Sequence, residues 1–449
     1  MSAAAPQDRL WIKDPLAILA DGAERGIVVR GRQIESLVPA GHEPEGPYRV
    51  FDAGRHVVLP GLVNTHHHFY QTLTRAHPAA INKPLFPWLQ ALYPIWARLT
   101  PDDLRSAVRI ALVELLMSGC TTAADHHYLY PAGLEQAVDI EVEAAREIGL
   151  RMTVTRGSMN LSQKDGGLPP DTVVQDEDTI LQDSERVLSL FHDASPGADI
   201  QIGLAPCSPF TVTERLMRET ATLAERFDCP LHTHLAETAD ETRFCLERYG
   251  CRPLDLLERN GWLTPRAWLA HGIHFDDAEV ATLGRHGVGI CHCAASNMVL
   301  ASGICRTVEL EAAGVKLGLG VDGSASNDAS NMMEALRQAL MIGRLRYGAE
   351  RVTHHDVIRW GTEGSARCLG RDDIGRIAPG MQADLALFTL DETRFAGAHD
   401  PLAALILCNA HRADRVMVAG QWRVENGQPV GMDLAKLIAD QRQAAKRFA

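Results

Sequence analysis

The sequence contains a His-x-His pair at the end of an apolar run. Residues 59–65, Leu-Pro-Gly-Leu-Val-Asn-Thr, lead directly into His66, His67 and His68. Residues two apart on an extended strand point to the same side, so His66 and His68 can direct two imidazoles at one ion while His67 points away. The pair indicates half of a metal site, although a short histidine cluster is also typical of a polar loop.

Three later segments contain residues that suit the same ion, and each ends a short apolar run. They are His234 in the segment 232–237, His271 in Ala-His-Gly, and Asp322 after a Gly-rich run. Glu237 follows His234 by three residues, which suits a carboxyl that carries protons beside a metal-activated water. Asp322 alone also fits a helix N-cap or turn residue. We interpret His232 as a hydrogen-bonded core histidine.

The elements that must position these residues form a repeating pattern. From about residue 100, amphipathic helical stretches alternate with short apolar runs, which predicts parallel strands connected by helices. The eight predicted strands are Val57 to Asn64, Cys120 to Asp125, Arg151 to Thr155, Asp199 to Ala205, Pro230 to His234, Trp268 to His271, Val288 to His292 and Val315 to Val321. This pattern favours an α/β fold of the (β/α)8 TIM-barrel type, whose chemistry lies at the C-terminal strand ends.

The two ends of the chain have a different pattern. Residues from about 10 to 55 and from about 379 to 430 contain short extended runs separated by turn residues. We therefore expect residues 1–58 and 379–449 to form one small β-sandwich, with the barrel spanning residues 59–378. The tail from Met432 has helical spacing and is predicted to be a surface helix.

Composition excludes several classes of function. The net charge of -13, with no basic stripe, argues against a nucleic-acid partner. No apolar run reaches the roughly 20 residues of a membrane helix, and the start of the chain lacks the features of a secretory signal, so we expect a cytoplasmic protein. The ten cysteines are predicted to be free thiols. Cys291 and Cys293 have the spacing of a soft-metal pair, but no second pair accompanies them.

Together these motifs resemble the amidohydrolase superfamily, in its aminohydrolase branch. The similar segments are 60–68, 234–237, 270–271, 292–297, 320–323 and 374–385. The resemblance implies that His66, His68, His234 and Asp322 ligate one divalent ion, zinc or else iron or manganese. Binuclear relatives carry a bridging lysine at the end of the fourth strand. Residues 203–208 contain no lysine here, which predicts a single metal ion.

The resemblance also implies hydrolytic deamination of an amino-substituted heterocycle. Asp322 would take a proton from the metal-activated water, Glu237 would protonate a ring nitrogen, and His271 would polarise the attacking oxygen. A barrel scaffold that has lost catalysis is the alternative from another class of protein. It is disfavoured because the complete set of ligands and proton carriers is present.

Three further residues are candidates to bind the substrate: Gln71, Trp88 and Arg156. Core or loop packing is the alternative for the aromatic Trp88, and a structural ion pair is the alternative for Arg156. Residues 65–75, 92–97 and 155–159 resemble the 8-oxoguanine deaminase group, which implies conversion of 8-oxoguanine to urate. Guanine, isoxanthopterin and N-alkylamino-hydroxytriazines stay open as substrates. The resemblance also implies that the chain forms a homo-oligomer. Its expected binding partner is the small-molecule substrate.

Overall fold

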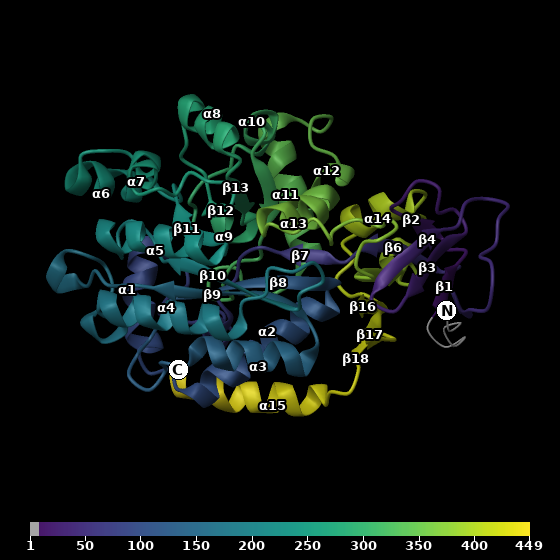
Figure 1. The fold of residues 1–449 in the computed structure, drawn as a ribbon, viewed down its shortest axis with the longest axis horizontal. Coiled ribbons are helices and arrows are strands. Elements are labelled where there is room, and N and C mark those ends of the chain that lie inside the picture. The colour runs from purple at the N-terminus through teal and green to yellow at the C-terminus, as the bar shows by residue number, and fades with distance from the viewer. Residues whose placement is uncertain (1–8) are drawn as a thin grey trace.

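A computed structural model of the protein describes residues 9–449, and its centre is a parallel sheet of eight strands (Figure 1). Each strand is hydrogen-bonded to the next one along the chain. The strands are β7 (Leu62–Asn64), β8 (Cys120–His127), β9 (Arg151–Ser158), β10 (Ile200–Pro206), β11 (Leu231–Leu235), β12 (Ala267–His271), β13 (Gly289–His292) and β14 (Lys316–Leu319). Every predicted strand is represented.

The last strand lies beside the first, which closes the sheet into a nearly complete barrel. Beyond the paired strands, the backbone N–H of Thr65 donates to the carbonyl of Leu319 (3.0 Å), and that of Asp322 donates to the carbonyl of His66 (3.0 Å). The predicted (β/α)8 barrel is therefore confirmed. Its closure also joins two predicted metal ligands that are 256 residues apart, 322 minus 66.

Helices surround the barrel and connect successive strands (Figure 1). The helix of residues 101–117 shows why they form. Pro101 occupies its first turn, Thr100 and Asp103 form a capping box, and it ends before Gly119, whose φ is +97°. The main connecting helices are α2 (Pro101–Met117), α3 (Ala137–Ile148), α4 (Glu177–Phe191), α5 (Glu214–Phe227), α6 (Ala239–Tyr249), α8 (Asp277–His286), α10 (Thr307–Ala312) and α11 (Met332–Tyr347).

The first predicted strand, residues 57–64, is divided in the structure. Its first part, β6 (His56–Pro60), pairs with β15 (Leu385–Thr389) outside the barrel, and only β7 belongs to the barrel. The break lies at Gly61, whose N–H donates to the carbonyl of Asp384 (2.8 Å). A Cβ at Gly61 would lie 2.0 Å from the Thr121 hydroxyl oxygen, so only glycine fits this close crossing.

Both ends of the chain build the two sheets beside the barrel, which confirms the predicted sandwich (Figure 1). One sheet has the order β4 (Gln33–Leu37), β3 (Gly26–Arg30), β1 (Arg9–Lys13), β5 (Arg49–Asp52). The other has the order β18 (Gln428–Pro429), β17 (Gln421–Glu425), β16 (Arg415–Val418), β15, β6, β2 (Ala17–Ile18). Buried Ile12 and Ile27 of one sheet pack in a common core with Leu387 of the other. The domain limits at residues 58 and 378 stay predictions.

The C-terminal tail is helical and the cysteines form no disulfides in residues 9–449. The predicted terminal helix is α15 (Leu434–Ala445), which packs against α2. All ten cysteines are free, as predicted, and nine of them are buried. Among residues 9–449, no helix is long and apolar enough to cross a membrane.

Candidate metal centre and catalytic pocket

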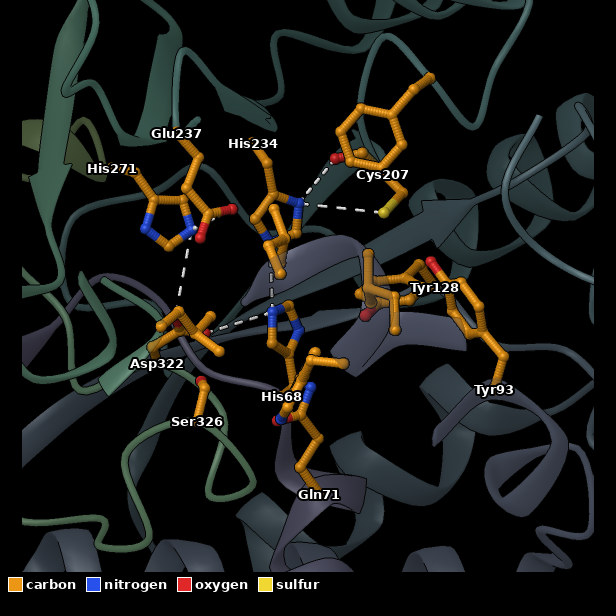
Figure 2. Close-up of a pocket in the computed structure, with 15 residues that line it drawn as sticks. His68, Gln71, Tyr93, Tyr128, Cys207, His234, Glu237, His271, Asp322 and Ser326 are labelled. Carbon is orange, nitrogen blue, oxygen red and sulfur yellow. Dashed lines mark hydrogen bonds and ion pairs between the residues drawn. The ribbon is translucent and has the colours of Figure 1, made fainter. Parts of the chain in front are cut away.

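A pocket of about 400 Å³ opens at the C-terminal ends of the barrel strands. Figure 2 shows the side chains that reach into it from different strand ends and from the segments that follow them. The lining residues are His68, Gln71, Leu85, Trp88, Leu89, Tyr93, Tyr128, Cys207, Phe210, His234, Glu237, His271, Leu300, Asp322 and Ser326. The pocket therefore lies where the barrel fold places catalytic residues.

The four predicted metal ligands come together at the inner end of this pocket. Oδ1 of Asp322 lies 3.4 Å from Nε2 of His66 and 3.4 Å from Nε2 of His68. Nε2 of His68 lies 3.2 Å from Nε2 of His234. All four side chains are buried. The carboxylate of Asp322 thus lies beside two of the imidazoles, and the third lies beside His68. The ligand atoms of His66, His68 and His234 also lie within 4.8 Å of that of a fourth imidazole, His126.

Backbone carbonyl groups fix which nitrogen of two imidazoles faces the other predicted ligands. Nδ1 of His68 lies 2.8 Å from the carbonyl oxygen of His126, and Nδ1 of His234 lies 2.7 Å from that of Cys207. A carbonyl oxygen only accepts, so each Nδ1 carries the proton. Each Nε2 therefore presents a lone pair to the centre, as metal-binding histidines require.

His66 is fixed in the same way through a second imidazole. Nδ1 of His232 donates to the carbonyl of Trp268 (2.8 Å), which leaves Nε2 of His232 as an acceptor. That atom lies 2.8 Å from Nδ1 of His66, which must donate to it. Nε2 of His66 has no hydrogen-bond partner. The placement of His232 as a hydrogen-bonded buried histidine agrees with its interpretation from sequence.

His67 is directed away from the converging ligands, as predicted. Its Nε2 lies 2.8 Å from the hydroxyl oxygen of Ser330, and its Nδ1 accepts from the backbone N–H of His68 (2.7 Å). The alternation of side chains along this extended segment therefore separates the triplet into two inward imidazoles and one outward imidazole.

The charges of the converging groups fit a divalent cation. Burial lowers the pKa of His68 to about 3, and burial likewise lowers the pKa of His234. Burial opposes ionisation of Asp322, but the adjacent His66 and the other imidazoles hold its pKa well below the usual value. Neutral imidazoles and one carboxylate, with lone pairs facing each other and no donor between them, are a ligand set for zinc or a similar ion.

Glu237 and His271 lie beside the ligands. Nε2 of His271 is 3.5 Å from Oε2 of Glu237 and 3.9 Å from Oδ2 of Asp322, so it faces both carboxyl groups (Figure 2). Burial raises the pKa of Glu237. Burial alone would lower the pKa of His271, but the charges of Glu237 and Asp322 raise it above the usual value. The pair is therefore suited to holding and moving a proton.

Two residues that hold this pair were missed by sequence reasoning. The hydroxyl of Ser302 donates to Oε1 of Glu237 (3.2 Å), and Oδ1 of Asn297 lies 3.0 Å from Nδ1 of His271. Both residues are buried. Asn297 ends the segment 292–297 that carries part of the family resemblance, which was the available signal. Nothing in the local sequence distinguishes Ser302.

Two of the three predicted substrate-binding residues line the pocket. Oε1 of Gln71 accepts from the backbone N–H of Ala325 (3.2 Å), and the indole N–H of Trp88 donates to the carbonyl of Ala325 (3.0 Å). Both side chains are thereby attached to the segment that follows Asp322. Tyr128, Cys207 and Phe210 also line the pocket, although their sequence context did not single them out.

Arg156 is not among the residues that line the pocket, and its contacts fit the alternative interpretation as a structural ion pair. The fully buried guanidinium donates to the carboxylate of Asp183 (2.9 Å), to the carbonyl of Gly157 (2.6 Å) and to Oε1 of Gln175 (2.8 Å). It also packs over the ring of Tyr130. Because all of its nitrogens are engaged, Arg156 is a structural ion-pair residue.

Comparison with known proteins identifies the family. The model of the Amidohydrolase family matches residues 57–423. The chain is 62% identical over 441 residues to 8-oxoguanine deaminase from Pseudomonas aeruginosa, covering 97% of this chain and 98% of the relative. The chain belongs to the amidohydrolase family. The resemblance predicted from sequence is thus confirmed.

Other amidohydrolases are similar over most of the chain. Isoxanthopterin deaminase from an unknown prokaryotic organism is 34% identical, covering 89% of this chain and 87% of the relative. The crystal structure of atrazine chlorohydrolase from Arthrobacter aurescens TC1 complexed with zinc has a TM-score of 0.91 and 30% identity, covering 97% of this chain and 100% of that chain. The fold and the chain length are therefore shared with characterised amidohydrolases.

Proposed function

We propose that this amidohydrolase is a metal-dependent deaminase that converts 8-oxoguanine and water to urate and ammonia. The observation that carries the proposal is the 62% identity, over nearly the whole chain, to an 8-oxoguanine deaminase. The converging ligands and the adjacent Glu237–His271 pair supply the groups that such a hydrolysis needs.

We infer that His66, His68, His234 and Asp322 hold one zinc ion, with iron as the alternative. The solved atrazine chlorohydrolase is complexed with zinc, and the orientation of the Nε2 lone pairs supports the same use here. When bound, the ion would lower the pKa of a water molecule towards 7 and so provide a nucleophile at neutral pH.

The residues around the ion would then carry the protons. Asp322 lines the pocket, and its Oδ2, which lies 3.9 Å from Nε2 of His271, can accept the proton that the attacking water loses. Glu237, whose pKa is raised by burial, keeps its proton to higher pH than a free carboxyl group and can deliver it to a ring nitrogen of the purine. His271, held by Asn297, faces the charge that develops at the reacting carbon. Asp322 would then return its proton to the exocyclic amine, so that the C–N bond breaks and the nitrogen leaves as ammonia. The remaining hydroxyl proton at the reacting carbon would restore the proton of Glu237 as the carbonyl of urate forms.

The outer part of the pocket suits a flat heterocycle. Trp88, Tyr93 and Phe210 place aromatic side chains around it, and Gln71 offers an amide whose oxygen is already bound to the backbone of Ala325. The Gln71 NH2 group therefore remains as a donor for an acceptor atom on the ring. Because Arg156 does not line the pocket, Gln71 is the stronger candidate for forming hydrogen bonds with the edge of the substrate ring.

The test is an assay of hydrolytic amine release, which measures ammonia from 8-oxoguanine, guanine and isoxanthopterin and alkylamine from hydroxyatrazine. We expect the highest kcat/KM with 8-oxoguanine, and a value no higher than that for the other substrates would contradict the proposed specificity. Failure to release ammonia or alkylamine from any of them, with zinc bound, would favour the non-catalytic scaffold. A homo-oligomer in the cytoplasm also stays a prediction, and light scattering of the purified protein tests the oligomeric state.

A further inference from the structure

A second cluster of metal-binding residue types lies outside the catalytic pocket. Asp125 and His127 are on β8, and Glu141 is on α3. Their side chains offer ligand atoms that all lie within 4.8 Å of one another. The exposed fraction is 1% for Asp125 and 0% for His127 and Glu141, and none of them lines the catalytic pocket.

The hydrogen bonds of this cluster leave four acceptor atoms without a donor. Nε2 of His127 must donate to the carbonyl of Leu129 (2.7 Å), so Nδ1 presents a lone pair. Oδ1 of Asp125 accepts from the backbone N–H of Phe69 (2.7 Å). Nδ1 of His127, Oδ2 of Asp125 and both carboxylate oxygens of Glu141 have no hydrogen-bond partner. Four buried acceptors facing each other are unfavourable unless a cation or protons lie between them.

The geometry repeats that of the catalytic ligands. Nδ1 of His127 lies 3.4 Å from Oε1 of Glu141, yet the two atoms do not form an aligned hydrogen bond. Nε2 of His66 lies at the same distance, 3.4 Å, from Oδ1 of Asp322 and is likewise without a hydrogen bond. Two atoms that ligate one ion point at the ion rather than at each other. In both clusters the second imidazole nitrogen is fixed by an acceptor, as in metal sites.

The charge of the cluster also favours a divalent cation. Within residues 9–449, no Lys or Arg forms a salt bridge with Asp125 or Glu141. Burial lowers the pKa of His127 to about 4, so this imidazole does not supply the missing positive charge. Burial raises the pKa of Asp125 to about 7 and also raises that of Glu141, and the two carboxyl groups are close enough to share a proton. Protonated carboxyl groups are therefore the competing state.

We propose that Asp125, His127 and Glu141 bind a second, structural divalent ion of the zinc class. One nitrogen and two carboxylates supply ligand atoms within 4.8 Å of one another, ligand types that zinc accepts, and a charge of +2 balances the two carboxylates. The ion would join β8 to α3. It would also fix Asp125, which holds the backbone of Phe69 directly after the catalytic ligand His68.

Metal analysis of the intact protein tests this proposal. After reconstitution with zinc and removal of loosely bound metal, we expect about two zinc ions per wild-type chain. Glu141→Gln should lower the count to one, and so should His234→Asn, which removes a catalytic ligand instead. Glu143→Gln is the matched control, because Glu143 is an exposed residue of the same helix. It should leave two ions.

Two outcomes would overturn the proposal. One is a count of one ion in the wild type, lost in His234→Asn and unchanged in Glu141→Gln, which would assign the cluster to protonated carboxyl groups. The other is the absence of an anomalous peak at the zinc edge between Asp125, His127 and Glu141 in crystals of the reconstituted wild type. The crystal experiment needs no variant and so does not depend on Glu141→Gln folding. Ammonia release by the wild type is measured separately and tests only the proposed function.

Discussion

At the scale of single residues, the proposed roles of metal ligand and proton carrier are separated by the surroundings of Asp322 and Glu237. Asp322 is surrounded by imidazoles that favour its charged form. Glu237 is buried and accepts one side-chain hydrogen bond, from the hydroxyl of Ser302. The pKa values of these two carboxyl groups in one pocket are therefore shifted in opposite directions: that of Asp322 is lowered, which favours its ionised form, and that of Glu237 is raised, which favours its protonated form. Such a division is what an acid and a base in the same site require.

The first prediction concerns Glu237. Glu237→Gln should lower kcat by roughly 10²- to 10⁴-fold, because the glutamine fills the same space but cannot transfer the proton. Zinc content should be unchanged, since Glu237 is not among the converging ligands. Steady-state ammonia release and metal analysis measure the two effects. Glu247→Gln, at an exposed position of the following helix, is the control and should behave as the wild type. Loss of zinc in Glu237→Gln would contradict the assigned role.

The second prediction concerns the pH dependence set by Ser302. Its hydroxyl donates to Glu237 and lowers the pKa that burial raises. A proton donor is active below its pKa, so activity should fall as the pH rises through the pKa of Glu237. Ser302→Ala removes the hydrogen bond, worth about 1 kcal/mol, and should shift this fall to higher pH by up to about one unit. A kcat/KM profile that moves to lower pH, or does not move, would refute the proposed contact.

At the scale of elements, the strands could be predicted because each contains its own signal. A short apolar run ending in Gly, His or Asp is local information, and it located all eight barrel strands and the ends that carry the ligands. The break at Gly61 could not be predicted, since it depends on Thr121 and Asp384, which are distant in sequence. For the same reason the contacts of Arg156 could not be predicted. Its position at the end of a strand is local, but its partners Asp183 and Gln175 lie on other segments.

The third prediction concerns the segment that follows β14. A Cβ added at Gly323 would lie 2.0 Å from Oε1 of Gln71, the movable end of that side chain. Gly323→Ala should therefore displace the Gln71 amide and raise KM, by about fivefold if one hydrogen bond to substrate is lost. The fold should persist, because only a side chain has to move. Kinetics of Gly323→Ala, Gln71→Ala and the double variant measure the coupling. Fully additive effects of the two substitutions would show that they act independently and would contradict the prediction.

At the scale of the whole molecule, one buried ion pair connects the barrel with the sandwich. Arg151 begins β9, and Asp384 directly precedes β15. Nε of Arg151 lies 3.1 Å from Oδ2 of Asp384, with side-chain exposures of 0% and 2%. The same carboxylate accepts from the backbone N–H of Ala419 (2.7 Å), and the carbonyl of Asp384 accepts from Gly61 (2.8 Å). This one residue therefore joins β9 of the barrel, the crossing between β6 and β7, and the segment after β16.

The last prediction follows from the burial of that pair. Asp384→Asn removes the buried carboxylate partner of Arg151 and leaves only the half-exposed Asp199, 3.0 Å away, as an ion-pair partner, so the free energy of unfolding should fall by about 3 kcal/mol. The matched control is Asp391→Asn, because Asp391 forms an exposed pair with Arg55, with side-chain exposures of 59% and 66%. An exposed pair contributes about 1 kcal/mol or less. Urea unfolding followed by tryptophan fluorescence and by circular dichroism measures both variants. If the barrel and the sandwich are one cooperative unit, both probes should report one earlier transition for Asp384→Asn. Equal stabilities of the two variants would mean that the buried pair does not couple the domains, and the sandwich would then have to be held by its apolar core alone.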